Sequence, residues 1–423
     1  MRYQLPLCAV LLAFGLAMPG SASATKSVEN HRVDLDYHVT LLPQSDQAEV
    51  RLTLEQGSAV RSLDLDLGNK GDFSDFSADG QWTTMPGPSG NALRGVWRPA
   101  PGKATLTYRV QINHRAAEGS TGKPRYDSRM TPDWALFRGE DLVPRARLDQ
   151  QNGVNLQSRL TFDLPSNWRN VETSWPRIGK NRFRVDNVSR LFDRPTGWML
   201  AGNLINRRAR LGDTDVTVSS PKGQGMRRME TLTLLTFVWP KLQALFPRPP
   251  GKLLVVGAQD AMARNARAGH DSIYLNSNRP LISESGASPL LRELVQVFAR
   301  IQTRDRSDWI RAGIAEYYSV ELLKRAGGMS EDRYQDWQSI MTRVGRKATT
   351  LRGERADPVM TARAVLLLGA LDQEIRNKTD DQKSLDDVVR GLVRIDAIST
   401  EDFIQISAGV MGESSKVLAT NLL

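Results

Sequence analysis

The chain has 423 residues, of which 40% are hydrophobic and 25% charged, so it is a globular protein long enough for two or three domains. Its formal net charge is +10. The basic runs "NRRARLG" (206–212) and "RVGRKATTLRGER" (343–355) contain no interleaved aromatic residues, which argues against a nucleic-acid site. We interpret the excess positive charge as a solvated surface, with contact to anionic polymers of the cell envelope as the alternative.

Residues 1–24 have the features of a secretory signal peptide. Arg2 precedes an apolar run from Leu5 to Met18, and the small residues Ala22-Ser23-Ala24 follow. Cleavage near Ala24 would remove Cys8, the only cysteine, so we expect a periplasmic or secreted protein without disulfides or thiolate metal ligands. No later apolar stretch is long enough to span a bilayer, so we expect no membrane-spanning segment.

Residues 25–222 are predicted to form a β-rich domain. Apolar and polar residues alternate in several short stretches, among them Val33 to Leu41, Leu106 to Ile112 and Leu160 to Leu164. Alternation places one face of a strand in a core and the other in water, as in antiparallel sheets. Turn-rich segments such as "MPGPSGN" and "RPAPGK" separate the stretches, so we expect an all-β, sandwich-like architecture.

Residues 223–423 are predicted to form a second domain that is mainly helical after residue 288, which makes the whole chain an α+β protein. The stretch "METLTLLTFVWPKLQALF" predicts a helix broken near Pro240, and "KLLVV" and "DSIYLN" predict strands. Ser288 followed by Pro289 predicts the start of a helix. A further helix is predicted in "SDWIRAGIAEYYSVELLKRAGG", capped by Ser307 or Asp308 and ended by Gly327.

The stretch "LLRELVQVF" (290–298) has the outline of a zinc-peptidase helix without its histidines. In an H-E-x-x-H helix, two histidines on one face bind zinc and the glutamate activates the bound water. Here those positions hold Arg292, Glu293 and Gln296. Arginine stays protonated and cannot bind zinc, and glutamine is a weak neutral donor. The general-base position is therefore retained and the metal ligands are not.

This stretch, followed by "DWIRAGIAEYYSVELLKRAGG", resembles the aminopeptidase N-like and glycyl-aminopeptidase-like gluzincins, in which W-x-x-E-G-x-x-E-Y-Y follows the H-E-x-x-H helix. The resemblance implies a β-domain followed by a thermolysin-like domain, and "LLLGALDQEIR" and "SLDDVVRGL" are similar to the family's later helices. The resemblance places Ala312 at the position of the third zinc ligand. It also places Thr361 where the family has the tyrosine that stabilises the oxyanion. Among the family's site residues, only Glu293 is retained.

The other candidate site residues have structural interpretations as well as functional ones. Glu293 is expected to be idle in catalysis and paired with a nearby arginine. Glu316, on the same helix face as Ala312, is either an alternative ligand or a local ion-pair partner. We expect three aromatic residues to be core anchors: Trp309, Tyr317 and Tyr318. The four histidines are too scattered for a local metal site, and we expect the last of them to be a loop residue: His31, His38, His114 and His270.

We therefore expect a secreted, catalytically inactive metallopeptidase homologue without a metal or other cofactor, which binds a peptide or an envelope protein or acts as a scaffold in the cell envelope. The strand "DSIYLN" is the expected edge to which a peptide would add. Arg292 is expected to pair with Glu293 or Glu316 in place of the metal, since a lone buried carboxylate is costly. The alternatives are a zinc-type aminopeptidase with a non-standard site made of Glu293 and Glu316, and a structural partner acting through the β-domain alone. The sequence indicates no oligomeric state.

Overall fold

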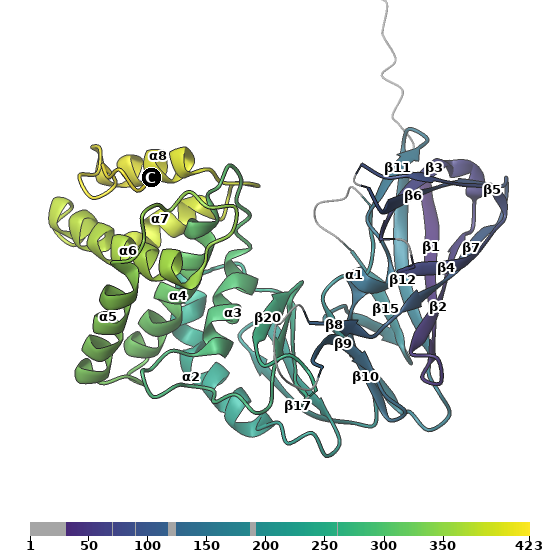
Figure 1. Cartoon of the computed structure of the whole chain (residues 1–423), viewed down its shortest axis with the longest axis horizontal. Coiled ribbons are helices and arrows are strands. Elements are labelled where there is room, and N and C mark those ends of the chain that lie inside the picture. The colour runs from purple at the N-terminus through teal and green to yellow at the C-terminus, as the bar shows by residue number, and fades with distance from the viewer. Residues whose placement is uncertain (1–30, 70, 89, 117–123, 187–191, 260) are drawn as a thin grey trace, which may run out of the picture.

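Two regions of different architecture follow each other along the chain, as the computed structural model in Figure 1 shows. It describes residues 31–69, 71–88, 90–116, 124–186, 192–259 and 261–423. The expected signal peptide, residues 1–24, lies outside the described residues. None of the helices in the described part is both long and apolar enough to cross a membrane.

The first region is built on a seven-stranded sheet whose inward faces carry the apolar residues of the alternating stretches. Within it β1 pairs in parallel with β12 and antiparallel with β2, with Tyr37 opposite Leu160 on one side and Leu52 on the other. All three of these side chains are fully buried. The strand order is β14 (Arg177–Gly179), β15 (Arg182–Val185), β12 (Val154–Asp163), β1 (His31–Leu42), β2 (Gln47–Leu54), β7 (Ala104–Gln111) and β4 (Phe73–Ala78).

Two smaller sheets complete this region. Their side chains share one core with the large sheet, in which Trp97 and Phe137 are fully buried. The four-stranded sheet has the order β11 (Ala146–Gln150), β3 (Val60–Asn69), β6 (Ala92–Pro99) and β5 (Gly80–Pro86). The five-stranded sheet has the order β13 (Asn170–Thr173), β16 (Trp198–Gly202), β10 (Trp134–Arg138), β9 (Tyr126–Met130) and β8 (His114–Arg115). The short helices are η1 (Gly57–Ala59) and α1 (Gly139–Leu142).

A second five-stranded sheet links the two regions. Its order is β17 (Leu204–Leu211), β18 (Thr214–Pro221), β19 (Lys252–Val256), β21 (Ser272–Leu275) and β20 (Ala266–Gly269). The expected domain boundary at residue 222 falls between β18 and β19, which are paired neighbours in this sheet.

The expected edge strand was wrong, although the strand itself exists. The segment "DSIYLN" forms β21, which pairs with β19 on one side and β20 on the other and is therefore internal. Its side chains are buried on both faces, including Ile273 and Tyr274. The edge at this side of the sheet is β20, a strand of intermediate burial with the sequence Ala-Arg-Ala-Gly.

Helices α2 to α8 pack on one another and on this sheet (Figure 1). The expected break near Pro240 does not occur, since α2 runs through it. The lost backbone hydrogen bond is outweighed by burial on both sides of the proline, of Val238, Trp239 and Leu242. The helices are α2 (Arg228–Leu245), α3 (Pro289–Ala299), α4 (Asp308–Arg325), α5 (Glu331–Gly345), α6 (Pro358–Lys378), α7 (Leu385–Leu392) and α8 (Thr400–Met411).

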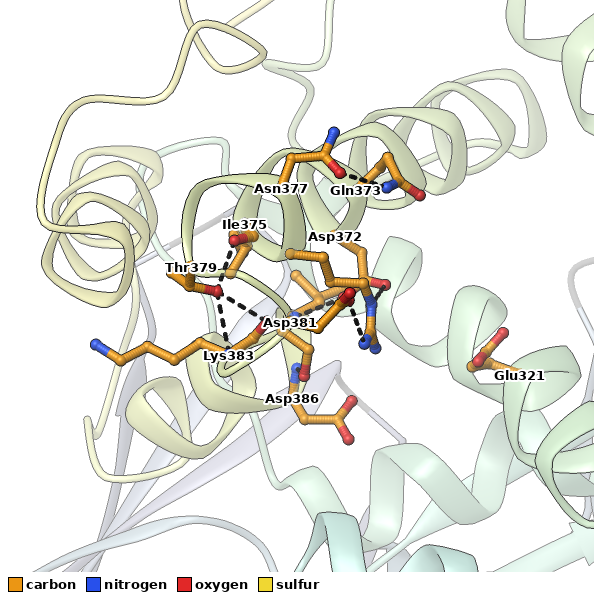
Figure 2. Close-up of polar contacts among 12 residues, drawn as sticks. Glu321, Asp372, Gln373, Ile375, Asn377, Thr379, Asp381, Lys383 and Asp386 are labelled. Atoms are coloured by element: carbon orange, nitrogen blue, oxygen red, sulfur yellow. Dashed lines mark hydrogen bonds and ion pairs between the residues drawn. The ribbon is translucent and has the colours of Figure 1, made fainter.

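The end of α6 and the start of α7 are held together by the carboxylate of Asp372 (Figure 2). Its Oδ1 accepts from the backbone N–H of Leu385 at 2.7 Å, and its Oδ2 accepts from Arg376 Nε at 2.8 Å. Ser384 caps α7 in a capping box with Asp387. Together these bonds satisfy the N–H groups that the first turn of α7 would otherwise leave without partners.

Candidate functional site

The candidate site lies where α3 faces α4. Ser288 Oγ caps α3 by accepting from Leu291 N at 3.2 Å, and Pro289 opens the helix, as the sequence predicts. In α4 the fully buried Trp309 anchors the first turn, with its Nε1 donating to Thr400 Oγ1 at 3.1 Å. Tyr317 and Tyr318 are also buried, so the three expected aromatic anchors are in the core.

Arg292 joins the two glutamates of the site. Its Nε lies 3.3 Å from Glu316 Oε2 on α4, and its Nη1 lies 3.5 Å from Glu293 Oε1 on α3. The Glu293 side chain is only 6% exposed, whereas the Arg292 side chain is 39% exposed. The expected ion pair is confirmed, and it involves both carboxylates at once.

Gln296 extends this pairing into a network between the helices. Its Nε2 donates to Glu293 Oε2 at 2.9 Å, and its Oε1 accepts from Arg311 Nη1 at 2.8 Å. Asp308 Oδ1 holds the same guanidinium through Nε at 2.9 Å and Nη2 at 2.7 Å. The amide thus connects an anion on its own helix with a cation on α4.

Burial dominates the electrostatics of both carboxylates. It raises the pKa of Glu293 above its ordinary value, although the charge of Arg292 and the N–H of Ala268 oppose the shift. Burial also raises the pKa of Glu316, again against the charge of Arg292. The guanidinium therefore offsets only part of the cost of burying two carboxylates together.

The other two positions of the expected site contribute no polar group to this network. Ala312 is 7% exposed and has only a methyl group to offer. Thr361 is 8% exposed, and its hydroxyl donates to the backbone O of Asp357 at 2.8 Å in the first turn of its own helix. The structure thus assembles Arg292, Glu293, Gln296 and Glu316, while Ala312 and Thr361 serve as packing residues.

The side chains present do not fit a zinc ion. Of the expected ligand positions, one holds a permanent cation, one an amide and one a methyl group. The guanidinium of Arg292 lies beside both remaining carboxylates. Across the described part of the chain, no three histidine, cysteine, aspartate or glutamate side chains are grouped so that they could hold a metal. His270, the closest histidine to the β21 strand, stacks on Trp175 with ring centroids 4.5 Å apart.

The edge strand β20 lies against this network. The N–H of Ala268 donates to Glu293 Oε2 at 2.8 Å. Glu293 therefore accepts a hydrogen bond from a backbone N–H on the unpaired edge of the sheet. A cavity of about 320 Å³ is lined by residues of the strand and of both helices, among them Ala266, Arg292, Glu293 and Glu316. The sequence does not predict β20, because its four residues show neither an apolar–polar alternation typical of a strand nor an apolar run.

The solved structures to which this chain is similar include peptidases. An aminopeptidase N family protein from Idiomarina loihiensis matches with a TM-score of 0.67 at 14% identity, over 88% of this chain and 72% of that one. A zinc metallopeptidase from Deinococcus radiodurans, solved with the substrate Tyr-Ser-Ala, matches with a TM-score of 0.55 at 16% identity, over 92% of both chains. Aminopeptidase A of Legionella pneumophila, in complex with aspartic acid, matches with a TM-score of 0.56 at 13% identity, over 90% of this chain and 48% of that one.

These likenesses confirm the expected α+β fold, a β-rich domain followed by a mainly helical aminopeptidase-like domain. No protein-family model matches the sequence, and no curated protein matches it.

Proposed function

We propose that this protein is a non-hydrolytic relative of the zinc aminopeptidases that binds peptides or extended protein segments at the edge of β20. The observation that carries the proposal is the guanidinium of Arg292 beside both Glu293 and Glu316. A cation already offsets the carboxylates that a metal site would use, while the edge strand and its cavity remain. Peptide binding in this geometry needs backbone pairing and a pocket for a side chain, not a metal.

The same observation weighs against a peptidase with a non-standard metal site at Glu293 and Glu316. A metal there would have to displace Arg292 from both carboxylates, and among the described residues no third histidine, cysteine, aspartate or glutamate is grouped with them. We expect purified protein to hold no stoichiometric zinc after dialysis and to release no amino acid from aminoacyl substrates. About one zinc per chain, or turnover that a chelator abolishes, would refute the proposal.

The binding half of the proposal is tested with the peptide Tyr-Ser-Ala, which occupies the similar structure from Deinococcus radiodurans. Ala266 and Ala268 are two apart on β20, so their N–H groups point to the same side, toward the open edge. Ala266→Pro removes one of these donors, and proline is tolerated on edge strands. Calorimetry should detect binding to the parent protein and at least about tenfold weaker binding to Ala266→Pro.

Ala266→Ser is the matched control, because it changes the side chain and keeps the N–H. It should bind the peptide as the parent protein does. Equal affinity for Ala266→Pro and Ala266→Ser, in variants that melt alike, would exclude the β20 edge as the binding site.

Secretion is part of the same proposal and rests on the features of residues 1–24. The mature protein should begin at Thr25 when it is isolated from the cell that makes it. An N-terminal sequence that still contains Cys8 would contradict the expected cleavage.

A further inference from the structure

A second cavity, of about 980 Å³, lies between the β-rich region and the sheet that links the two regions. Strands β13, β14, β15, β17, β18 and β19 contribute to its walls. Six cationic side chains line it: Arg177, Arg184, Arg208, Arg210, Lys252 and Arg300. Four acidic side chains also line it, so the lining has an excess of two positive charges: Glu172, Asp186, Asp215 and Asp271.

The acidic residue Glu172 orients cations in this cavity. The residue is 3% exposed, and its Oε1 accepts from Arg208 Nη2 at 2.6 Å and from Asn206 Nδ2 at 2.9 Å. Its Oε2 accepts from Arg177 Nη2 at 3.4 Å. A single carboxylate fixes two guanidinium groups from different strands and neutralises only one of their charges.

Lys252 adds a third cation to the same wall. Its Nζ donates to the backbone O of Trp175 at 3.1 Å, and within the described residues no carboxylate lies at ion-pair distance from it. Burial lowers the pKa of Lys252 to about 8, with Glu172 opposing and Arg177 and Arg208 adding to the effect. The positive charge of the ammonium is therefore not neutralised by a carboxylate of the cavity.

The outer charges of the cavity largely cancel one another. Arg210 Nη1 lies 3.1 Å from Asp215 Oδ1, and Arg300 Nη2 lies 2.7 Å from Asp271 Oδ1. The excess charge is thus concentrated around Glu172, where Arg177, Arg208 and Lys252 meet one carboxylate.

We propose that this cavity binds the phosphate group of a small, soluble phosphomonoester. The two guanidinium forks match the oxygens of a phosphate, and the ammonium supplies a point charge. A phosphomonoester carries close to two negative charges at neutral pH, which matches the excess of two positive charges. The cavity is separate from the network of α3 and α4, so the proposal does not depend on the proposed function.

The test is calorimetry on the full mature chain at low ionic strength, with inorganic phosphate and glycerol phosphate as probes and acetate as a singly charged control. Phosphate and glycerol phosphate should bind at least about tenfold more tightly than acetate. Arg208→Gln should weaken phosphate binding by about tenfold, since it removes one charge-assisted fork. Lys252→Met should have an effect of the same size.

The matched control is Arg61→Gln. Arg61 is also a strand arginine paired with a carboxylate, Asp149 at 2.7 Å, and its side chain is 55% exposed against 62% for Arg208. It does not line the cavity, so phosphate affinity should stay within about twofold of the parent value.

A second readout follows the ammonium of Lys252 by NMR. Saturating phosphate should raise the pKa of Lys252 from about 8 toward the ordinary lysine value. Three results would each overturn the proposal: no phosphate binding by the parent protein, equal affinity for acetate, or equal losses in Arg208→Gln and Arg61→Gln. If Lys252→Met does not fold, the exposed Arg208 still decides the outcome.

Discussion

At the scale of single residues, Arg292 supplies the positive charge beside the two glutamates of the candidate site. Glu293 is buried and Glu316 is largely covered, with 17% of its side chain exposed, so each carboxylate would be costly without a countercharge. The guanidinium lies within 3.5 Å of both. Because arginine stays charged at any working pH, this countercharge is permanent and needs no metal supply.

Arg292→Ala should therefore destabilise the protein by about 1–3 kcal/mol at neutral pH, nearer the lower value because the side chain is 39% exposed. Both glutamates already have raised pKa values, and losing Arg292 raises them further. When the pKa of a carboxyl group is higher in the folded than in the unfolded state, the free energy of unfolding falls as pH rises through the folded-state pKa. The deficit should thus be larger at about pH 8 than at about pH 5, as measured by urea midpoints.

Arg61→Ala serves as the comparison, because the Arg61–Asp149 pair is exposed on both sides. It should cost less than about 1 kcal/mol, with no increase toward alkaline pH. An Arg292→Ala protein that unfolds at the parent midpoint would mean that the two glutamates do not need this cation.

At the scale of secondary-structure elements, the Asp372 side chain connects α6 to the first turn of α7 through a hydrogen bond (Figure 2). Asp372→Ala leaves the N–H of Leu385 without its acceptor, and it leaves Arg376 with only Asp381, whose Oδ1 lies 3.7 Å from Nη1. We expect a loss of about 1–3 kcal/mol in the free energy of unfolding, since both bonds involve a charged group that is 14% exposed. Thermal and urea unfolding of the variant would measure it.

The neighbouring residue provides the control for this prediction. Gln373 donates to Asn377 Oδ1 at 2.8 Å on the exposed face of α6 (Figure 2). Gln373→Ala should cost about 0.5 kcal/mol or less. If both variants lose the same stability, the position of Asp372 between two helices has no special importance.

The elements also show how far the sequence could predict this structure. Local signals were reliable in most places: Ser288 caps its helix and the alternating stretches are strands, whereas Ser307 precedes α4 without a side-chain cap bond. Pro240 was misjudged, because the burial that keeps α2 continuous is a tertiary effect. The position of β21 inside its sheet was also misjudged, since periodicity predicts a strand and not its neighbours.

The candidate site was predictable in part for the same reason. The charges at 292, 293 and 316 predicted an ion pair, because helix spacing and charge follow from the sequence. The bridge from Gln296 to Arg311 depends on how two helices face each other, and no pattern in the chain encodes it directly. The cationic cavity around Glu172 was not foreseen, since its residues come from six separate strands and from loops.

At the scale of the whole molecule, the two regions are joined by shared packing as well as by the chain. Trp198 of β16 and Tyr274 of β21 lie in one buried cluster, with ring centroids 5.1 Å apart. Trp198 Nε1 also donates to the backbone O of Arg267 in β20 at 2.9 Å. The edge strand at the candidate site is therefore held in place from the β-rich side.

The pairing of β18 with β19 predicts where the chain can be cut. A fragment of residues 223–423 lacks β17 and β18, so the paired edge of β19 and its buried residues Leu253 and Val255 would be exposed. We expect it to aggregate or to melt without cooperativity, whereas a fragment of residues 203–423 should keep a cooperative transition in circular dichroism. Equal melting of the two fragments would show that β17 and β18 are dispensable to the helical region.

Restoring the ligands tests whether α3 and α4 present the geometry of a metal site. The contacts from Arg292 to Glu316 and from Gln296 to Arg311 show that α3 and α4 face each other at these positions. The triple variant Arg292→His, Gln296→His and Ala312→Glu places two imidazoles and a carboxylate there, and it removes the competing guanidinium. Zinc should then raise the melting temperature, because it binds the folded state.

The control for this experiment is Arg292→Ala, Gln296→Ala and Ala312→Glu, which removes the same native contacts and supplies no nitrogen ligands. It should be less stable than the parent protein and should not respond to zinc. The two variants differ only in their imidazoles, so a zinc response in the first alone must come from the rebuilt site. A folded triple variant that ignores zinc would mean that the distance between α3 and α4 has changed along with the ligands, and that the scaffold now suits only the ion pair.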